Sequence, residues 1–161
     1  MKIAVLSDTH LPFAAKELPK DVYKNLEHAD AIIHAGDYQV ASVIDTLQSI
    51  APFYGVYGNM DGGETRQRLP ARRIIQIGGF SIGVMHGWGS PAGLENRILA
   101  SFKEDRIDVL VYGHSHRAKN EHKDGILICN PGSPTDSRFA QFQSMGVLTI
   151  EEKITGEILY F

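Results

Sequence analysis

Cysteine and long apolar runs are what this sequence has least of. Cys129 is the single cysteine among 161 residues, so no internal disulfide can form and nothing indicates an oxidising compartment. No apolar run is long enough to cross a bilayer, and the four apolar residues from Ile3 to Leu6 are too few for the core of a signal peptide. We therefore expect a cytoplasmic protein with no membrane partner.

A strong charge of either sign is also missing. The chain has 16 basic and 19 acidic residues, and its net charge of −3 argues against broad electrostatic binding to nucleic acid or to an anionic membrane. One local exception is the group Arg66, Arg68, Arg72 and Arg73. These arginines could bind the phosphates of a longer substrate or a nucleic acid strand, or they form a solvated loop, and no nucleic-acid motif accompanies them.

A hydrophobic content of 43% over 161 residues is enough for a packed core, and we expect one domain spanning residues 1–161. In the first part of the chain, short apolar runs alternate with segments of helical periodicity. The expected strands are 2–8, 31–37 and 53–59, and the expected helices are 19–30 and 40–50. This alternation predicts parallel strand pairing.

The second half of the chain follows a different pattern. Residues 72–87 predict two strands that turn at Gly78-Gly79, and residues 145–161 predict a closing hairpin. Between them we expect a helix over 91–106 and strands over 108–113 and 126–133. The fold class is therefore mixed α/β, and the exposed face of the last hairpin could support a homo-oligomer.

Residues able to bind metal gather at the ends of the predicted strands. A lone histidine at a strand end is more often a core or surface residue than a ligand, but five strand ends share the feature here. The residues are Asp8, His10, Asp37, Asn59, Asp61, His86, His114 and His116. Ligands bind at this edge of α/β sheets, and in extended backbone the i, i+2 pairs "DTH" and "HSH" would each point two side chains to one place.

These blocks, "DTH", "GD", "GNMD", "HG" and "GHSH", occur in the order found in the calcineurin-like metallophosphoesterases, and the sequence resembles the small bacterial and archaeal phosphodiesterases of that superfamily. The resemblance implies a four-layer αββα sandwich of two mixed sheets. It also implies two metal ions. One would be bound by Asp8, His10 and His116, the other by Asn59, His86 and His114, with Asp37 bridging.

Oxygen and imidazole donors without thiolate suit Mn, Ni, Co, Fe or Zn better than Mg or Ca, and we expect Mn. Such a site favours hydrolysis of a small phosphodiester or a nucleotide by in-line attack of a metal-bridging hydroxide. In that reading the catalytic residues are Asp37, Asn59, His86 and Asp61. The alternatives are a nuclease or phosphomonoesterase with the same site, or a non-catalytic metal-binding scaffold. A eukaryotic relative of this fold is a scaffold in membrane-trafficking complexes, but that reading requires loss or weakening of metal ligands, and none is missing here.

Four further residues bear on substrate and mechanism. Met60 stands where larger members of the superfamily carry a histidine, which predicts a preference for leaving groups that depart without a proton donor. Asp61 either holds a ligand histidine in its tautomer or forms a turn. Arg138 is a candidate contact for a substrate phosphate and Trp88 for a ring, against the alternatives of a solvated loop arginine and a loop-anchoring tryptophan.

Overall fold

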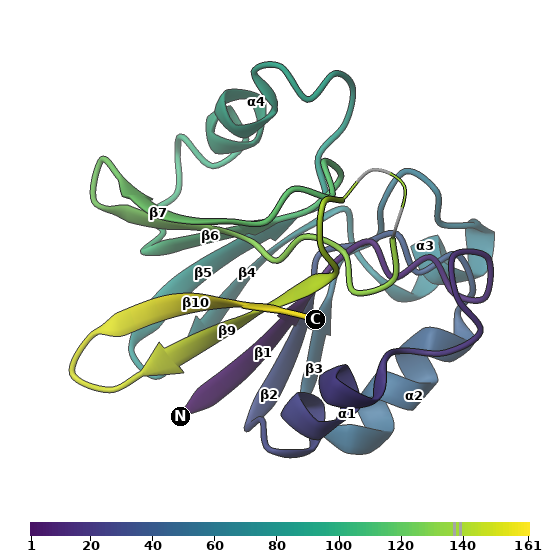
Figure 1. Cartoon of the computed structure of the whole chain (residues 1–161). Helices are drawn as coiled ribbons and strands as arrows, with labels where there is room; N and C mark the ends of the chain where they lie inside the picture. Colours follow the sequence, from purple (N-terminus) through teal and green to yellow (C-terminus); the bar gives the residue numbers. More distant parts are fainter. Residues whose placement is uncertain (137, 139) are drawn as a thin grey trace.

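The computed structural model describes residues 1–136, 138 and 140–161, and it contains two mixed five-stranded sheets packed face to face (Figure 1). The first sheet has the strand order β10-β9-β1-β2-β3. Its strands are β1 (Lys2–Leu6), β2 (Ala31–His34), β3 (Phe53–Gly55), β9 (Ser144–Ile150) and β10 (Ile154–Tyr160). Strands β1, β2 and β3 are parallel, as predicted, and the closing hairpin adds β9 antiparallel to β1 and β10 antiparallel to β9.

The second sheet has the order β4-β5-β6-β8-β7. Its strands are β4 (Arg72–Ile77), β5 (Phe80–Met85), β6 (Val109–Tyr112), β7 (Lys119–Lys123) and β8 (Ile126–Asn130). The three central strands β5, β6 and β8 are parallel, and β4 and β7 form antiparallel edges. The two-strand reading of residues 72–87, with its turn at Gly78-Gly79, is confirmed.

Helices cover the outer face of each sheet. Helices α1 (Lys20–Glu27) and α2 (Ser42–Ile50) lie on the first sheet, and α4 (Leu94–Ala100) lies on the second (Figure 1). The short helix α3 (Gly63–Arg68) follows the end of β3. The result is the predicted αββα sandwich of four layers.

Side-chain alternation along the parallel strands creates this layering. In β1, Ile3 and Val5 point between the sheets, whereas Ala4 and Leu6 pack against the first pair of helices. Strand β6 alternates in the same way, with its even-numbered residues packing against α4. Strands buried on both faces need apolar residues at every position, which is why the sequence shows short continuous runs there.

Three elements differ from the sequence prediction. Strand β7 was not predicted because its sequence, KNEHK, is polar and half-exposed at a sheet edge, so it carries no alternation. Helix α3 occupies part of the arginine-rich stretch that we expected to be a loop. The helix predicted over 91–106 is regular only from Leu94 to Ala100, after Gly93 with a left-handed backbone. Among the described residues no helix is long and apolar enough to cross a membrane.

The loops that follow the parallel strands of both sheets meet at one end of the sandwich. Within the first sheet, the Asp8 N–H donates to the Gly36 carbonyl at 2.9 Å. Within the second, the Gly113 N–H donates to the His86 carbonyl at 3.2 Å. The His114 N–H then donates to Asp8 Oδ2 at 3.0 Å and joins the two sheets. The site is built at this junction.

Candidate metal centre

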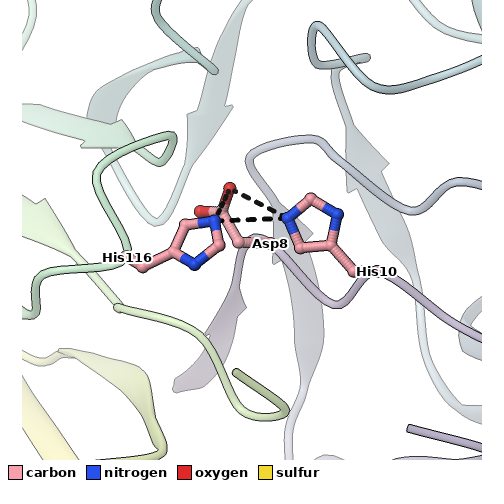
Figure 2. A group of neighbouring side chains, drawn as sticks. All are labelled: Asp8, His10 and His116. Atoms are coloured by element: carbon pink, nitrogen blue, oxygen red, sulfur yellow. Dashed lines mark hydrogen bonds and ion pairs between the residues drawn. The ribbon is translucent and has the colours of Figure 1, made fainter. Parts of the chain in front are cut away.

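Five of the predicted ligands converge in the structure. Asp8 Oδ1 lies 3.3 Å from His116 Nε2 and 3.7 Å from His86 Nε2, and Asp37 Oδ2 lies 3.3 Å from His86 Nε2. His10 Nε2 lies 3.2 Å from His116 Nε2, 3.8 Å from Asp8 Oδ1 and 3.7 Å from Asp37 Oδ2. Figure 2 shows Asp8, His10 and His116 facing one another across the two sheets. All five side chains are buried or nearly so.

The ligand-bearing loops do not have the extended backbone that the i, i+2 spacing suggested. Asp8, His10, Asp37, His114 and His116 all have positive φ, between 43° and 74°. Each pair lies beyond its strand, because β1 ends at Leu6 and β6 ends at Tyr112. Left-handed turns, rather than the alternation of a strand, therefore aim these side chains. Non-glycine residues in this region are uncommon and cluster at functional sites.

Asp8 is held so that one carboxylate oxygen faces the cluster. Its Oδ2 accepts hydrogen bonds from the Ser7 hydroxyl at 2.7 Å and from the His114 N–H at 3.0 Å. Its Oδ1 is buried and has no hydrogen-bond partner within the described chain. A Cβ on Gly113 would stand 1.8 Å from Ser7 Oγ. The glycine before the "HSH" block thus makes room for the end of β1.

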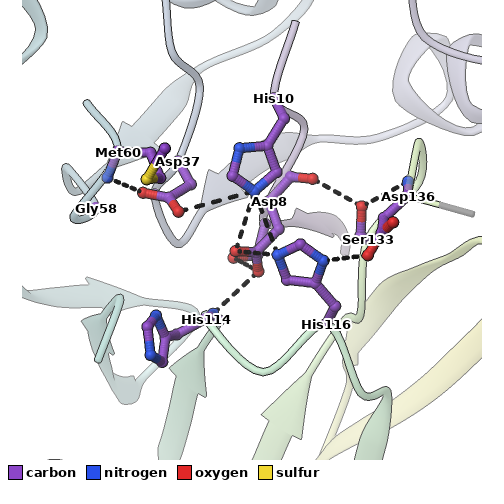
Figure 3. Close-up of polar contacts among 12 residues, drawn as sticks. Asp8, His10, Asp37, Gly58, Met60, His114, His116, Ser133 and Asp136 are labelled. Carbon is purple, nitrogen blue, oxygen red and sulfur yellow. Dashed lines mark hydrogen bonds and ion pairs between the residues drawn. The ribbon is translucent and has the colours of Figure 1, made fainter. Parts of the chain in front are cut away.

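Asp37 is oriented by a hydrogen bond from the Met60 N–H to its Oδ1, at 2.8 Å (Figure 3). One of our two interpretations was that Asp61 holds a ligand histidine in its tautomer, but the hydrogen bonds of its carboxylate within the described chain go to the backbone instead. Its carboxylate accepts four backbone N–H groups, from Asp37, Tyr38, Gln39 and Gly58, at 2.7 to 2.9 Å. Asp61 therefore fixes the loop that presents Asp37, and the turn-forming alternative is nearer to what the structure shows.

The second ring nitrogens of two histidines have partners that point Nε2 inward. His86 Nδ1 lies 2.7 Å from the Ala35 carbonyl, which can only accept a hydrogen bond, so Nδ1 carries a proton and, in the neutral ring, Nε2 is the nitrogen with a lone pair for a metal. Asp136 holds His116 Nδ1 in the same way (Figure 3). Such partners set the tautomer of metal-binding histidines.

Asp136 and Gln39 are two site residues that the sequence did not reveal. The Gln39 amide lies 2.9 Å from His10 Nδ1, opposite the nitrogen that faces the cluster. Asp136 follows the "NPGS" turn of residues 130–133, and Ser133 of that turn donates to the Asp8 carbonyl at 2.7 Å. An acidic residue after a strand-end turn was the available signal for Asp136. Gln39 had none.

Charges outweigh burial in setting the pKa values of the cluster. Burial opposes ionisation of Asp8, yet the neighbouring histidines, His86 first, hold its pKa well below the usual range. Burial also opposes protonation of His86, but Asp8 and Asp37 raise its pKa to about 9. For His116, Asp8 and Asp136 likewise overcome burial and raise the pKa to about 9. The cluster is thus a strong site for positive charge.

The side chains form two adjacent groups that could each hold a metal ion. One is Asp8, His10 and His116, and the other is Asp8, Asp37 and His86. Asp8 Oδ1 and His86 Nε2 both belong to the second group and lie 3.7 Å apart. Both atoms are buried and have no hydrogen-bond partner in the described chain. Carboxylate and imidazole donors suit divalent transition metals. The residues present therefore fit a dinuclear metal centre.

Asn59 and His114 lie beside the second group. His114 Nδ1 is 2.8 Å from Asn59 Oδ1 and its Nε2 is 2.7 Å from the Gly89 carbonyl, while its ring packs edge-on to that of His86. Neither residue belongs to the two ligand groups that the described side chains form. Their role as ligands stays a prediction.

A cavity of about 560 Å³ opens over the centre. Its lining includes Phe13, Met60, Arg117 and Arg138 next to the ligand candidates. The candidate substrate residue Arg138 is thus placed at the site. Trp88 is not among the described residues that line this cavity. Its side chain is 44% exposed, and its carbonyl accepts a hydrogen bond from Arg97.

Three of the four clustered arginines have partners within the chain. Arg66 donates to the Asp61 carbonyl at 2.8 Å and lies over the Tyr57 ring. Arg68 forms an ion pair with Asp45, and Arg72 forms one with Asp105. Their guanidinium groups serve the local structure of α3 and β4.

Known proteins share both the sequence and the fold. The calcineurin-like phosphoesterase superfamily domain matches residues 1–153. The probable metallophosphoesterase MJ0623 of Methanocaldococcus jannaschii is 38% identical over 160 residues, which cover 99% of this chain and 81% of that protein. Phosphodiesterase MJ0936 of the same organism is 27% identical over 173 residues and 99% of each chain.

Among solved structures, Vps29 of Chaetomium thermophilum has a TM-score of 0.82 at 22% identity, with 100% of this chain and 98% of that one covered. At this identity the likeness shows the fold alone. The family match and the relatives extend over almost the whole chain and include every block of the metal centre. The chain belongs to the calcineurin-like phosphoesterase superfamily.

Proposed function

We propose that this protein is a metal-dependent phosphodiesterase that acts on small phosphodiesters or nucleotides. The observation that carries the proposal is the pair of ligand groups sharing Asp8 beneath one open cavity. A relative over the full length, MJ0936, is named a phosphodiesterase, which supports the same reaction class. Two divalent ions bound here would lower the pKa of a bound water and neutralise charge on phosphoryl oxygens.

The residues of the chain contribute preorganised positions. Asp8 and Asp37 each use one carboxylate oxygen to accept from the backbone and keep the other for the centre. His86 Nδ1 donates to a carbonyl, which leaves Nε2 as the nitrogen that would bind a metal in place of a proton. Because these hydrogen bonds exist before substrate arrives, little reorganisation accompanies the reaction.

In the reaction a water oxygen forms a bond to phosphorus while the bond from phosphorus to the leaving oxygen breaks in line. The leaving oxygen takes the electron pair and later a proton from solvent. Met60 lies in the cavity lining where a proton donor would stand in larger family members, and its side chain is 56% exposed. We therefore propose that diesters with stable leaving groups are hydrolysed fastest.

The test compares bis(p-nitrophenyl) phosphate with p-nitrophenyl phosphate. Chelator-stripped protein is assayed alone and after addition of Mn, Ni, Co, Zn or Mg, with single-stranded DNA and RNA as further substrates. We expect no turnover without metal, and metal-restored hydrolysis that is faster on the diester. His116→Ala should abolish it, whereas His122→Ala, an exposed histidine on β7, should not.

Each alternative predicts a different result. Faster hydrolysis of the monoester or of nucleic acid would replace the proposed substrate class. Metal binding by calorimetry without turnover on any substrate would overturn the proposed reaction and favour a non-catalytic scaffold.

A further inference from the structure

Arg117 stands where three cavities adjoin. It follows His116 directly, its side chain is exposed, and it lines the cavity over the metal centre. It also lines a groove of about 410 Å³ beside α4, which we call the α4 groove, and a third cavity of about 670 Å³. Arg117 is thus beside the reacting centre and beside the space into which a larger substrate would extend.

The α4 groove adjoins the metal cavity. Pro91, Ser115 and Arg117 line both spaces, so a molecule seated over the metal centre meets the groove at Arg117. The groove lining also includes Asn96, whose side-chain amide can donate hydrogen bonds to an anion.

Charge within the α4 groove leaves Arg117 as its uncompensated cation. Lys119 and Lys123 also line the groove, but both form ion pairs with Glu95, and Lys119 forms another with Glu121. Arg117 uses its backbone N–H for Ser115 Oγ, and its guanidinium has no ion pair or hydrogen bond within the described chain. The two lysines are neutralised locally, and this arginine is available.

The third cavity differs in character. Its lining contains Phe142 and Tyr160, whose rings meet edge to face with centroids 6.1 Å apart. A phosphate entering it would lose water against apolar rings, which is unfavourable. An anionic group that reaches Arg117 from the metal centre is therefore better placed in the α4 groove.

We propose that Arg117 binds a second phosphate group of the substrate at the mouth of the α4 groove, so that phosphodiesters carrying an additional phosphate are preferred. A guanidinium binds a phosphate with two parallel hydrogen bonds, which fixes the position of the substrate as well as its charge. The inference rests on the proposed function, because it names the substrate class of the same site.

The test uses two substrates with the same leaving group. Both are the p-nitrophenyl ester of thymidine 5′-phosphate, and one also carries a 3′-phosphate. We expect the wild type, with Mn, to show a kcat/KM about tenfold higher for the 3′-phosphorylated substrate, mainly through KM, as one charge-assisted contact allows. The preference should shrink when salt is raised.

Variants test whether Arg117 causes the preference for the 3′-phosphorylated substrate. Arg117→Gln should lower the ratio of the two kcat/KM values from about ten to about one, and Arg117→Lys should retain part of it. Arg106→Gln, an exposed arginine on the segment after α4, is the matched control and should keep the full ratio. Equal thermal unfolding of the variants excludes misfolding. A ratio that is unchanged in Arg117→Gln would overturn the proposal.

A binding measurement separates this inference from the reaction. Calorimetry with thymidine 3′,5′-bisphosphate and thymidine 5′-monophosphate, with and without Mn, should show tighter binding of the bisphosphate, lost in Arg117→Gln. If that difference appears without turnover of any ester, the proposed reaction fails and the phosphate site stands. If esters are hydrolysed and neither assay shows a preference, the phosphate site fails alone.

Discussion

The strands and the loops at their carboxyl ends differ in both residue type and backbone conformation. Strand β1 is apolar from Ile3 to Leu6, extended and buried on both faces. Two residues later Asp8 has a φ of 54° and an unsatisfied carboxylate oxygen in a buried position. The same change occurs between β6 and His114. Within a few residues the chain passes from buried apolar strand, which stabilises the fold, to strained polar loop, which destabilises it.

This contrast shows where the stability of the site comes from. A non-glycine residue held in a left-handed conformation costs on the order of 1–3 kcal/mol, and burial of unpaired charge costs more. The apolar layers on both faces of the strands supply the free energy that holds such residues in place. The loops contribute the chemistry, and a metal ion would give a partner to the unsatisfied atoms Asp8 Oδ1 and His86 Nε2.

The largest effect is expected in the loops. Asp37→Ala should reduce phosphodiester turnover by about 10³-fold or more, because it removes one of the two carboxylates of the ligand group Asp8, Asp37 and His86. Arg138→Ala should reduce it far less. The measurement is kcat with Mn, with Asp45→Ala on the exposed face of α2 as control. Near-normal turnover of Asp37→Ala would show that the loop does not carry the reaction.

A substitution within a strand should lower the stability of the fold and leave turnover unchanged. Ile33→Ala removes a fully buried side chain between the sheets and should lower the free energy of unfolding by about 2–5 kcal/mol. Turnover per folded molecule should stay unchanged, since the hydrogen bonds of the loops remain. Urea unfolding and kinetics at a temperature where the variant is folded measure both. A stable variant with lost activity would contradict the division of roles.

Asp136 tests how far the loop network extends beyond the ligands. Asp136→Asn weakens the partner of His116 Nδ1 and should cost about 10–100-fold in metal affinity or activity. Asp124→Asn, in the turn between β7 and β8, is a control with the same chemical change at an exposed position. Metal titration by calorimetry is the readout. Equal metal affinities of the two variants would show that Asp136 does not contribute to metal binding.

His34 lies where the two regions meet, at the end of β2. Burial holds its pKa at about 3, so the folded protein keeps it neutral, with the Gly36 N–H donating to Nδ1. An unfolded histidine takes up a proton near pH 6.5, so stability is full above that pH and falls by about 1.4 kcal/mol per unit below it, until about pH 3.

The measurement for His34 is the urea midpoint from pH 7.5 to 4.5 with metals chelated. The wild type should lose more stability on acidification than His34→Gln, which has no proton to take up. If the urea midpoints of the two proteins fell in parallel with pH, His34 would not contribute to the pH dependence of stability.

The sequence by itself determined the strands of the parallel core, the family blocks and five of the ligand candidates, Asp8, His10, Asp37, His86 and His116. Short apolar runs mark buried strands because every position there faces a packed layer, and metal ligands stand out because few other roles place histidines and aspartates after so many strands. By contrast, β7 and α3 escaped prediction, since polar edge and surface elements carry no hydrophobic period.

Only the tertiary structure decided how the ligands are aimed and what holds them. Left-handed turns aim Asp8 and His116, four backbone N–H groups hold Asp61, and Asp136 is the partner of His116. The hydrogen bond from the Ser133 hydroxyl to the Asp8 carbonyl joins residues 125 positions apart. Local sequence fixes which groups can donate or accept a hydrogen bond. Which of them meet depends on the packing of two sheets, and that packing is a property of the whole chain.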